Sequence, residues 1–389
     1  MLVAGLLLIG LVADDDGLFR YAGQRLAGAA RSGVLVFAGA TVIIAAVTVT
    51  LNLDTSVAFL TPVFVYTARS RGQGAAGAGA ALLYGCLLLS NAGSLLLPGS
   101  NLTNLIVLGH LRLTGGQFAA RMWLPWLGAL AVTAVVVAVG ERRSLGLARP
   151  AGSPGLAGNP GLAGDPGLAG NPGPAGGPGP AGRAVPADGP GPVTEPPQRP
   201  AADPGRPVLG AGLAAVLLAT AAVVALPSPA IPVLVLGVVA AGLRLAQRRV
   251  TLGQAREVLS LPVLIGLFGV AVALGTLGRA WSGPAAGLSH LNGWATAGVA
   301  GLATIALNNL PAASLLAARA VSHPFSLLVG LNLGPNLCVT GSLAWLLWLR
   351  AARGAGAQPS LGRASALGLV AVPLSMAVAL AALALTGGM

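Results

Sequence analysis

Charged residues are scarce in this chain, and lysine is absent. Only 8% of the 389 residues are charged, 4% are aromatic, and there are 2 cysteines, Cys86 and Cys338, far apart in apolar context. A soluble protein carries roughly 25% charged residues, so the composition excludes an ordinary soluble domain, and the cysteines make no disulfide framework. The chain is 55% hydrophobic, with a mean hydropathy of +0.81. These values predict an all-α polytopic membrane protein.

Basic residues give a net charge of +12, but their placement does not favour nucleic acid. All are arginines, and most fall between apolar runs, where they read as topology signals under the positive-inside rule. The sequence has no Walker A motif, no G-x-S-x-G and no Cys-x-x-Cys, and its histidines show no metal-ligand spacing. We therefore expect a multi-pass protein of the cell membrane that is not an enzyme and has no cofactor, no metal site and no nucleic-acid partner.

The chain divides into three parts by composition. Residues 1–148 form a first transmembrane repeat, residues 149–207 a Gly/Pro-rich linker and residues 208–389 a second repeat, with about 9 to 10 membrane segments in total. Glycine recurs at every third position from Gly155 to Gly182, the G-X-Y pattern of collagen. We predict a disordered or polyproline-like linker, with trimerisation through this tract as the alternative. The first apolar run is short for a span, so we expect that the chain starts inside a membrane segment.

Polar breaks interrupt the apolar segments at matching places in the two halves. Because a bilayer core offers no water, irregular polar backbone survives there only where it faces protein or lines a cavity. Paired interruptions indicate a transporter with repeated halves and a midplane site. The candidate site residues are, in the first half, Asn52, Asp54, Thr55, Ser90, Asn91, Ser94, Ser100, Asn101 and Asn104, and in the second half Asn308, Asn309, Asn332, Gly334, Asn336, Thr340, Gly341 and Ser342.

Asp54 is the only acidic residue set within an apolar segment. A carboxylate at membrane depth persists mainly in ion or proton pathways, which predicts a coupling role; the alternative is a helix cap. The asparagines and serines of the breaks suit a bound solute or ion, or else hydrogen bonding between helices. A thiolate of Cys86 or Cys338 would be a soft ligand for a metalloid, although two small core residues are the simpler reading.

Four motifs resemble a known family. LNLDTSVAFLTP (51–62), SNAGSLLLPGSNLTNLIV (90–107), NNLPA (308–312) and GLNLGPNLCVTGSLAWLLWLR (330–350) are similar to the arsenical-pump membrane protein (arsenite permease) family of the ion transporter superfamily, and more distantly to divalent-anion:sodium symporters. The resemblance implies two inverted repeats with re-entrant hairpins and broken helices. It matches Asp54 to the acidic position of the first motif, and Ser90 to Asn104 to the first hairpin. It matches Asn308, Asn309 and Pro311 to the second hairpin, and Asn332 to Ser342 to the second broken helix.

The function expected from this resemblance is that of a secondary permease, which exports arsenite, antimonite or a related small oxyanion in exchange for protons through Asp54. A soluble ATPase partner and a homo-oligomer are left open. One alternative is a sodium-coupled symporter of dicarboxylate or sulfate, against which no basic residue at membrane depth is evident to neutralise a dianion. The other is a non-transporting scaffold, trimerised by the collagen-like tract. The expected partners are thus a small anion or metalloid, a proton or sodium ion, and the lipid bilayer.

Overall fold

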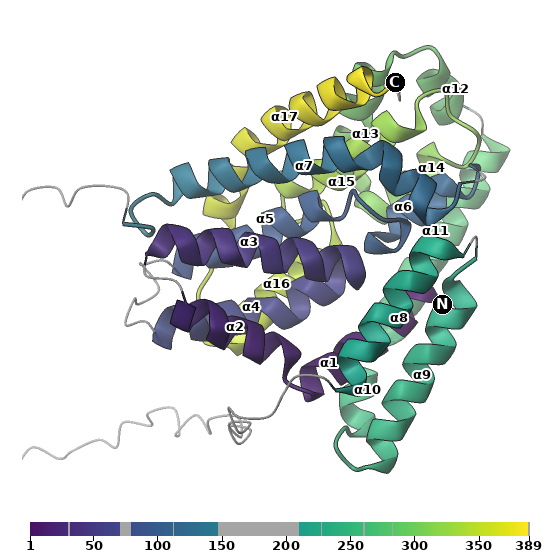
Figure 1. Cartoon of the computed structure of the whole chain (residues 1–389). Helices are drawn as coiled ribbons and strands as arrows, with labels where there is room; N and C mark the ends of the chain where they lie inside the picture. Colours follow the sequence, from purple (N-terminus) through teal and green to yellow (C-terminus); the bar gives the residue numbers. More distant parts are fainter. Residues whose placement is uncertain are drawn as a thin grey trace, which may run out of the picture. The chain divides into compact units, whose positions relative to one another are not determined.

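The computed structural model describes residues 1–29, 32–70, 79–111, 113–146, 210–226, 228–259, 261–281 and 283–387. Every regular element within these ranges is helical, which confirms the predicted all-α class (Figure 1). Residues 1–148 and 207–389 belong to one compact unit. The predicted linker at 149–207 lies outside the described residues, so its conformation and any role in trimerisation stay predictions.

The helices of the two halves follow the apolar runs of the sequence, because a membrane segment must satisfy its backbone hydrogen bonds internally. The first half contains α1 (Leu2–Asp15), α2 (Leu18–Ala29), α3 (Gly33–Thr50), α4 (Leu53–Ser70), α5 (Gly79–Gly93), the 3₁₀ turn η1 (Pro98–Ser100), α6 (Leu102–Leu108) and α7 (Gly115–Gly140). The second half contains α8 (Ala211–Ala225), α9 (Ala230–Ala246), α10 (Leu252–Leu259), α11 (Leu261–Ala280), α12 (Gly283–Ser289), α13 (Gly293–Leu307), α14 (Asn309–Leu316), α15 (Pro324–Leu333), the 3₁₀ turn η2 (Gly334–Leu337), α16 (Leu343–Gly354) and α17 (Leu361–Leu385).

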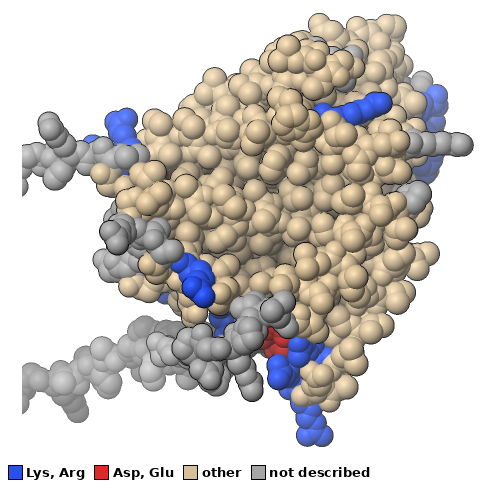
Figure 2. Space-filling view, viewed as in Figure 1, with Lys and Arg blue, Asp and Glu red and all other residues tan. Residues whose placement is uncertain are grey.

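Three of the described helices, α3, α7 and α17, are long and apolar enough to cross a membrane on their own. Several others, such as α5, α8, α9 and α13, are apolar but have only 15 to 17 residues. Figure 2 shows a face that is mostly uncharged, as a surface in contact with lipid requires. The chain is therefore a membrane protein, while the predicted number of membrane segments stays a prediction.

A hairpin and a broken helix form the core of the first half. The helices α3 and α4 are joined by two residues, Leu51 and Asn52, and run side by side in opposite directions (Figure 1). The expectation that Ser90 to Asn104 forms the hairpin is wrong, since α5 and α6, the helices on either side of η1, do not pack side by side as the arms of a hairpin would. Pro98 lacks the N–H that an α-helix would need, so the chain passes through a 3₁₀ turn before it resumes.

The second half repeats this arrangement. The helices α13 and α14 are joined by one residue, Asn308, and α15 continues through η2 into α16. In both halves the first hairpin helix packs parallel to the first part of the broken helix: Phe37 and Thr48 of α3 lie against Gly85 and Gly93 of α5. Likewise, the glycines at positions 330 and 334 pack closely on α13.

The two halves enter the membrane region from opposite ends of α7. At the C-terminal end of α7, Gly33 at the start of the first hairpin lies against Leu145. Near its N-terminal end, the ring of Phe118 lies 6.3 Å from that of Phe325 at the start of the second broken helix. Opposite entry of two similar units is the arrangement of an inverted repeat, and it brings the tips of the hairpins and the breaks together in the interior.

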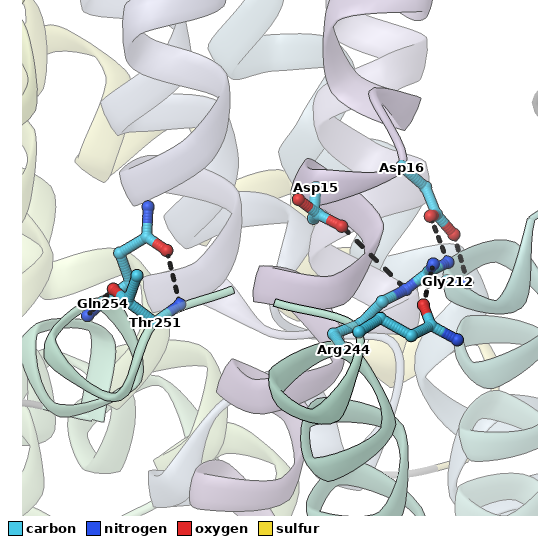
Figure 3. Close-up of polar contacts among 7 residues, drawn as sticks. Asp15, Asp16, Gly212, Arg244, Thr251 and Gln254 are labelled. Atoms are coloured by element: carbon cyan, nitrogen blue, oxygen red, sulfur yellow. Dashed lines mark hydrogen bonds and ion pairs between the residues drawn. The ribbon is translucent and has the colours of Figure 1, made fainter. Parts of the chain in front are cut away.

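A charged cluster fastens α1 to α8 and α9 at one end of these helices (Figure 3). The carboxylate of Asp16 accepts a hydrogen bond of 2.7 Å from the backbone N–H of Gly212 and pairs with the guanidinium of Arg244, whose Nε lies 3.9 Å from an oxygen of Asp15. The paired side chains of Arg244 and Asp16 are only 10% and 7% exposed. These three helices are thus held together by a largely buried ion pair.

Candidate functional site

Asn332, on α15 of the second half, joins the broken helices of the two halves. Its Oδ1 accepts hydrogen bonds from Ser94 Oγ (2.7 Å) and Asn101 Nδ2 (2.8 Å) of the first half. Its Nδ2 donates to Asn104 Oδ1 (2.8 Å) and to the carbonyl of Leu328 (2.9 Å). The side chain is fully buried, and its amide has four partners, which is the full capacity of an asparagine side chain.

A second asparagine pair lies beside it. Asn91 Nδ2 donates to Asn336 Oδ1 (2.8 Å), and Asn336 Nδ2 donates to the carbonyl of Leu88 (3.0 Å). Ser90 lies 3.1 Å from Ser56 of the first hairpin, Oγ to Oγ. These contacts bring together polar residues of the two long breaks, while Asn91 Oδ1 is buried without a hydrogen-bond partner among the described residues.

Two tryptophans donate hydrogen bonds to backbone carbonyls at the helix breaks, where the carbonyls have no partner within the helix. Trp345 Nε1 donates to the carbonyl of Pro335 (2.8 Å), and Trp126 Nε1 donates to that of Gly93 (3.1 Å). Asn104 Nδ2 donates to the carbonyls of both Ser94 and Leu97, at 2.8 and 3.0 Å. These carbonyls are therefore occupied by protein donors, and the asparagines join the helices of the two halves by hydrogen bonds.

A small cavity lies next to this bridge, at the tips of the two hairpins. Its volume is about 20 Å³, and it is lined by Leu53, Asp54, Asn101, Leu102, Asn308, Asn309, Leu310, Ser342 and Leu343. Five of these were candidate site residues in the sequence. The four leucines were missed, because apolar residues at helix starts carry no polar signal.

Three helices of at least eight residues begin at this cavity: α4, α14 and α16. The start of a helix exposes backbone N–H groups and the positive end of the helix dipole, so it attracts anions. Ser342 precedes α16 but makes no side-chain capping hydrogen bond. Its Oγ is buried and has no hydrogen-bond partner among the described residues. The cavity wall thus includes an unused hydroxyl that suits an anion.

Asn308, between α13 and α14, has a strained backbone. Its φ and ψ angles are 77° and 153°, a region that is essentially restricted to glycine and costs about 1–3 kcal/mol for other residues. The side chain holds this conformation, because Nδ2 donates to the carbonyl of Thr340 (3.1 Å), while the N–H of Asn309 donates to the carbonyl of Gly341 (2.8 Å). The second hairpin is therefore tied to the second break beside the cavity, which Asn308 and Asn309 line.

Asp54 lies in the first turn of α4, half-buried, on the cavity wall. The cap of this helix is Asn52, whose Oδ1 accepts from the N–H of Thr55 (2.7 Å), so Asp54 is free of the capping role considered for it. Among the described residues its carboxylate has no ion-pair partner. The cavity therefore combines two kinds of group: a carboxylate, which attracts a cation, and helix N-termini, which attract an anion.

The other predicted residues lie around the cavity without lining it. Ser100 Oγ lies 3.4 Å from the carbonyl of Val49, and Thr340 Oγ1 donates to that of Ile305 (2.8 Å). Gly334 packs against α13 so closely that an added Cβ would lie 2.6 Å from a Cα atom, and Gly341 packs equally closely on η2. These positions support the cavity by packing.

Neither cysteine lines the cavity. Cys86 is buried 3.4 Å from Thr61 Oγ1, and Cys338 lies 3.0 Å from Thr340 Oγ1. Among the described residues no group of His, Cys, Asp and Glu side chains is placed to hold a metal ion.

Comparison with known proteins identifies the family. No curated protein matches the chain. The sequence model described as "CitMHS: Citrate transporter" matches residues 1–351. This match confirms the ion transporter superfamily and a membrane-bound secondary transporter of anions, but gives no support to the arsenical-pump family in particular. With most of its length matched, the chain belongs to the CitMHS citrate transporter family.

Proposed function

We propose that this protein carries citrate or a closely related polycarboxylate across the membrane, together with a coupling cation. The observation that carries the proposal is the meeting of three helix starts, α4, α14 and α16, at one cavity with an unused buried hydroxyl, Ser342 Oγ. Helix N-termini bind carboxylates through backbone N–H groups without any basic side chain. Membership of the citrate transporter family agrees with this chemistry.

Asp54 is the proposed cation site. An ionised carboxylate about 4 Å from a bound anion would repel it by about 4 kcal/mol at an effective dielectric constant of about 20. A proton or a sodium ion at Asp54 removes this repulsion, so the anion binds well only when the cation is present. We propose a proton first, since a carboxylate in an apolar segment is typical of proton pathways.

The cavity must enlarge before a polycarboxylate can occupy it. A volume of about 20 Å³ is enough for about one water molecule. The helix starts of α4 on one side and of α14 and α16 on the other come from different halves of the chain. Separation of the halves at this point would open the cavity, which is the kind of motion that alternating access around a fixed site requires.

The test is uptake of labelled citrate into proteoliposomes. Leu343→Asp places a fixed carboxylate at the start of α16, where it competes with the substrate, and we expect it to abolish uptake; Leu343→Asn, of the same shape without the charge, retains it. Uptake by the Leu343→Asp protein at the rate of Leu343→Asn would overturn the proposed anion site.

Coupling is tested on the same vesicles with a pH gradient or a sodium gradient. We expect Asp54→Asn to lose the acceleration by the gradient, whereas Asp14→Asn, the same chemical change at the end of α1, keeps it. If gradient-driven uptake survives Asp54→Asn, the carboxylate is not the coupling site. If only the sodium gradient drives uptake, sodium replaces the proton in the proposal.

Efflux of arsenite or antimonite is the competing assignment, carried by the resemblance of the motifs. The cavity wall includes no thiol, the soft ligand that a metalloid prefers. If everted vesicles that contain the protein show arsenite efflux but no citrate flux, arsenite efflux replaces citrate transport as the proposed function. A lack of any flux, with a crosslinked trimer that disappears when residues 155–182 are deleted, would favour the scaffold.

A further inference from the structure

A large groove opens between α11 and the helices α1, α6 and α14. Its volume is about 680 Å³, and most of its lining is apolar, with Phe268 and Val272 of α11 facing Ile106 of α6 and Leu310 of α14. Phe268 is 71% exposed and Val272 47% exposed. In a membrane protein such a surface is covered by acyl chains, and a groove of this size would bury one of them.

The groove follows most of α11. From Ile265 to Arg279, the first and last residues of α11 that line it, an α-helix rises ~21 Å, about two thirds of the ~30 Å hydrocarbon core. Trp281 follows directly after α11 and is 57% exposed, the position of an interfacial tryptophan. Arg279 therefore lies at headgroup depth, and the apolar part of the groove extends from there toward the bilayer centre.

Arginines lie at the headgroup end. Arg279 lines the groove. Arg319 Nη2 donates to the backbone carbonyl of Arg279 (2.8 Å), which places a second arginine at the same end of α11. Arg279 donates to Thr276 Oγ1 (3.2 Å) and has no carboxylate partner among the described residues. Arginines in this position suit a phosphate.

We propose that this groove binds one anionic phospholipid of the bilayer, with its phosphate at Arg279 and Arg319 and an acyl chain along α11 toward Leu102 and Leu310. A zwitterionic lipid would lack the net charge that the arginines favour, and a free anion would leave the apolar wall uncovered. The inference does not depend on which solute the protein transports.

The lipid would also contact the wall of the transport cavity. Leu102 and Leu310 line both the groove and the small cavity, so these two side chains alone are shared between the two spaces. An acyl chain that fills the groove presses on the starts of α6 and α14. Occupancy of the groove is therefore expected to change the rate of transport as well as the stability of the protein.

The test is native mass spectrometry of the full chain, titrated with phosphatidylglycerol or phosphatidylcholine. We expect phosphatidylglycerol to bind at one site, and Arg279→Gln to weaken it about fivefold. Gly275→Leu should abolish the site, because Gly275 lines the groove and a Cβ there meets no atom closer than 3.8 Å, so the larger side chain fills the groove without a clash. Arg142→Gln, an exposed arginine just beyond the far end of α7, is the matched control and should bind like the wild type.

Two results would overturn the proposal. One is equal affinity for phosphatidylglycerol and phosphatidylcholine, which would mean that the charges are not used. The other is unchanged phosphatidylglycerol binding by a folded Gly275→Leu protein, which would place the lipid elsewhere. Competition by inorganic phosphate separates the sources of the anion: displacement at millimolar concentration would indicate a phosphate site without a lipid and would also reject the proposal.

Discussion

Replacement of Asn332 by leucine removes the bridge between the two halves of the chain while nearly conserving the volume of the side chain. Three hydrogen bonds to the first half are lost, those with Ser94, Asn101 and Asn104, and Asn104 Oδ1 loses the only partner that the structure gives it. Ser94 keeps its bond to the carbonyl of Asn91 (2.7 Å), so its hydroxyl stays satisfied.

The expected loss of stability follows from these bonds. Hydrogen bonds between membrane helices contribute on average about 0.6 kcal/mol each, so three of them give about 2 kcal/mol. If the amide of Asn101 and the carbonyl of Asn104 instead suffer the full penalty of buried unpaired groups, at about 1–3 kcal/mol each, the loss reaches about 6 kcal/mol. We therefore expect a decrease of about 2–6 kcal/mol in the free energy of unfolding.

The measurement is unfolding by SDS in mixed micelles, followed by the fluorescence of the buried Trp345 and Trp348. Asn292→Ala is the matched control, because this exposed asparagine makes a single capping hydrogen bond, to the N–H of Ala295 (2.9 Å), and its loss costs about 1 kcal/mol. A cycle with Asn104→Leu should be non-additive. If Asn332→Leu costs no more than the control, or if the cycle is additive, the bridge does not hold the halves together.

Three further substitutions test the packing around the site. Gly334→Ala adds a Cβ only 2.6 Å from a backbone atom of α13, so we expect the free energy of unfolding to fall by about 1–3 kcal/mol in the same assay. The control is Gly298→Ala, where a Cβ meets nothing within 4 Å and which should stabilise the protein by about 0.5–1 kcal/mol. Equal effects of the two substitutions would contradict the close packing. Arg244→Met leaves the largely buried carboxylate of Asp16 without its partner. We therefore expect the free energy of unfolding to fall by about 3–5 kcal/mol, with little dependence on salt. A small or strongly salt-dependent decrease would mean that the ion pair is exposed to solvent. Trp345→Phe removes the 2.8 Å hydrogen bond to a carbonyl of η2, and the exchange of the freed backbone with deuterium should increase there but not in α7.

The polar breaks were read correctly from the sequence as sites of irregular structure in the interior. The α-helix α5 ends at Gly93, and η1 begins at Pro98, inside the stretch that was singled out. A proline-glycine pair and clustered amides disrupt a helix locally, so neighbouring residues suffice to locate the break. The same local signal could not tell a hairpin from a broken helix, because both begin with a break and differ only in the direction that the chain takes afterwards.

The sequence predicted that the two long breaks share one site, but the contacts between their residues needed the fold. Asn91 and Asn336 are 245 positions apart, and nothing in either motif says that they bind each other. In the structure Asn332 is saturated by protein partners, whereas Asn91 Oδ1 and Ser342 Oγ are buried without a hydrogen-bond partner among the described residues. The sequence objection to a carboxylate substrate, that no basic side chain lies at membrane depth, also loses its force, since the positive groups at the cavity are backbone N–H groups.

The amino-acid sequence by itself determined that this protein is a helical membrane protein with two similar halves, because apolar content and helix breaks act through adjacent residues. It also fixed Asp54 as the one carboxylate within an apolar segment. The tertiary structure alone decided that α4, α14 and α16 begin at one point. That meeting depends on two units that enter the membrane region from opposite sides, a property of the whole chain that no local pattern encodes.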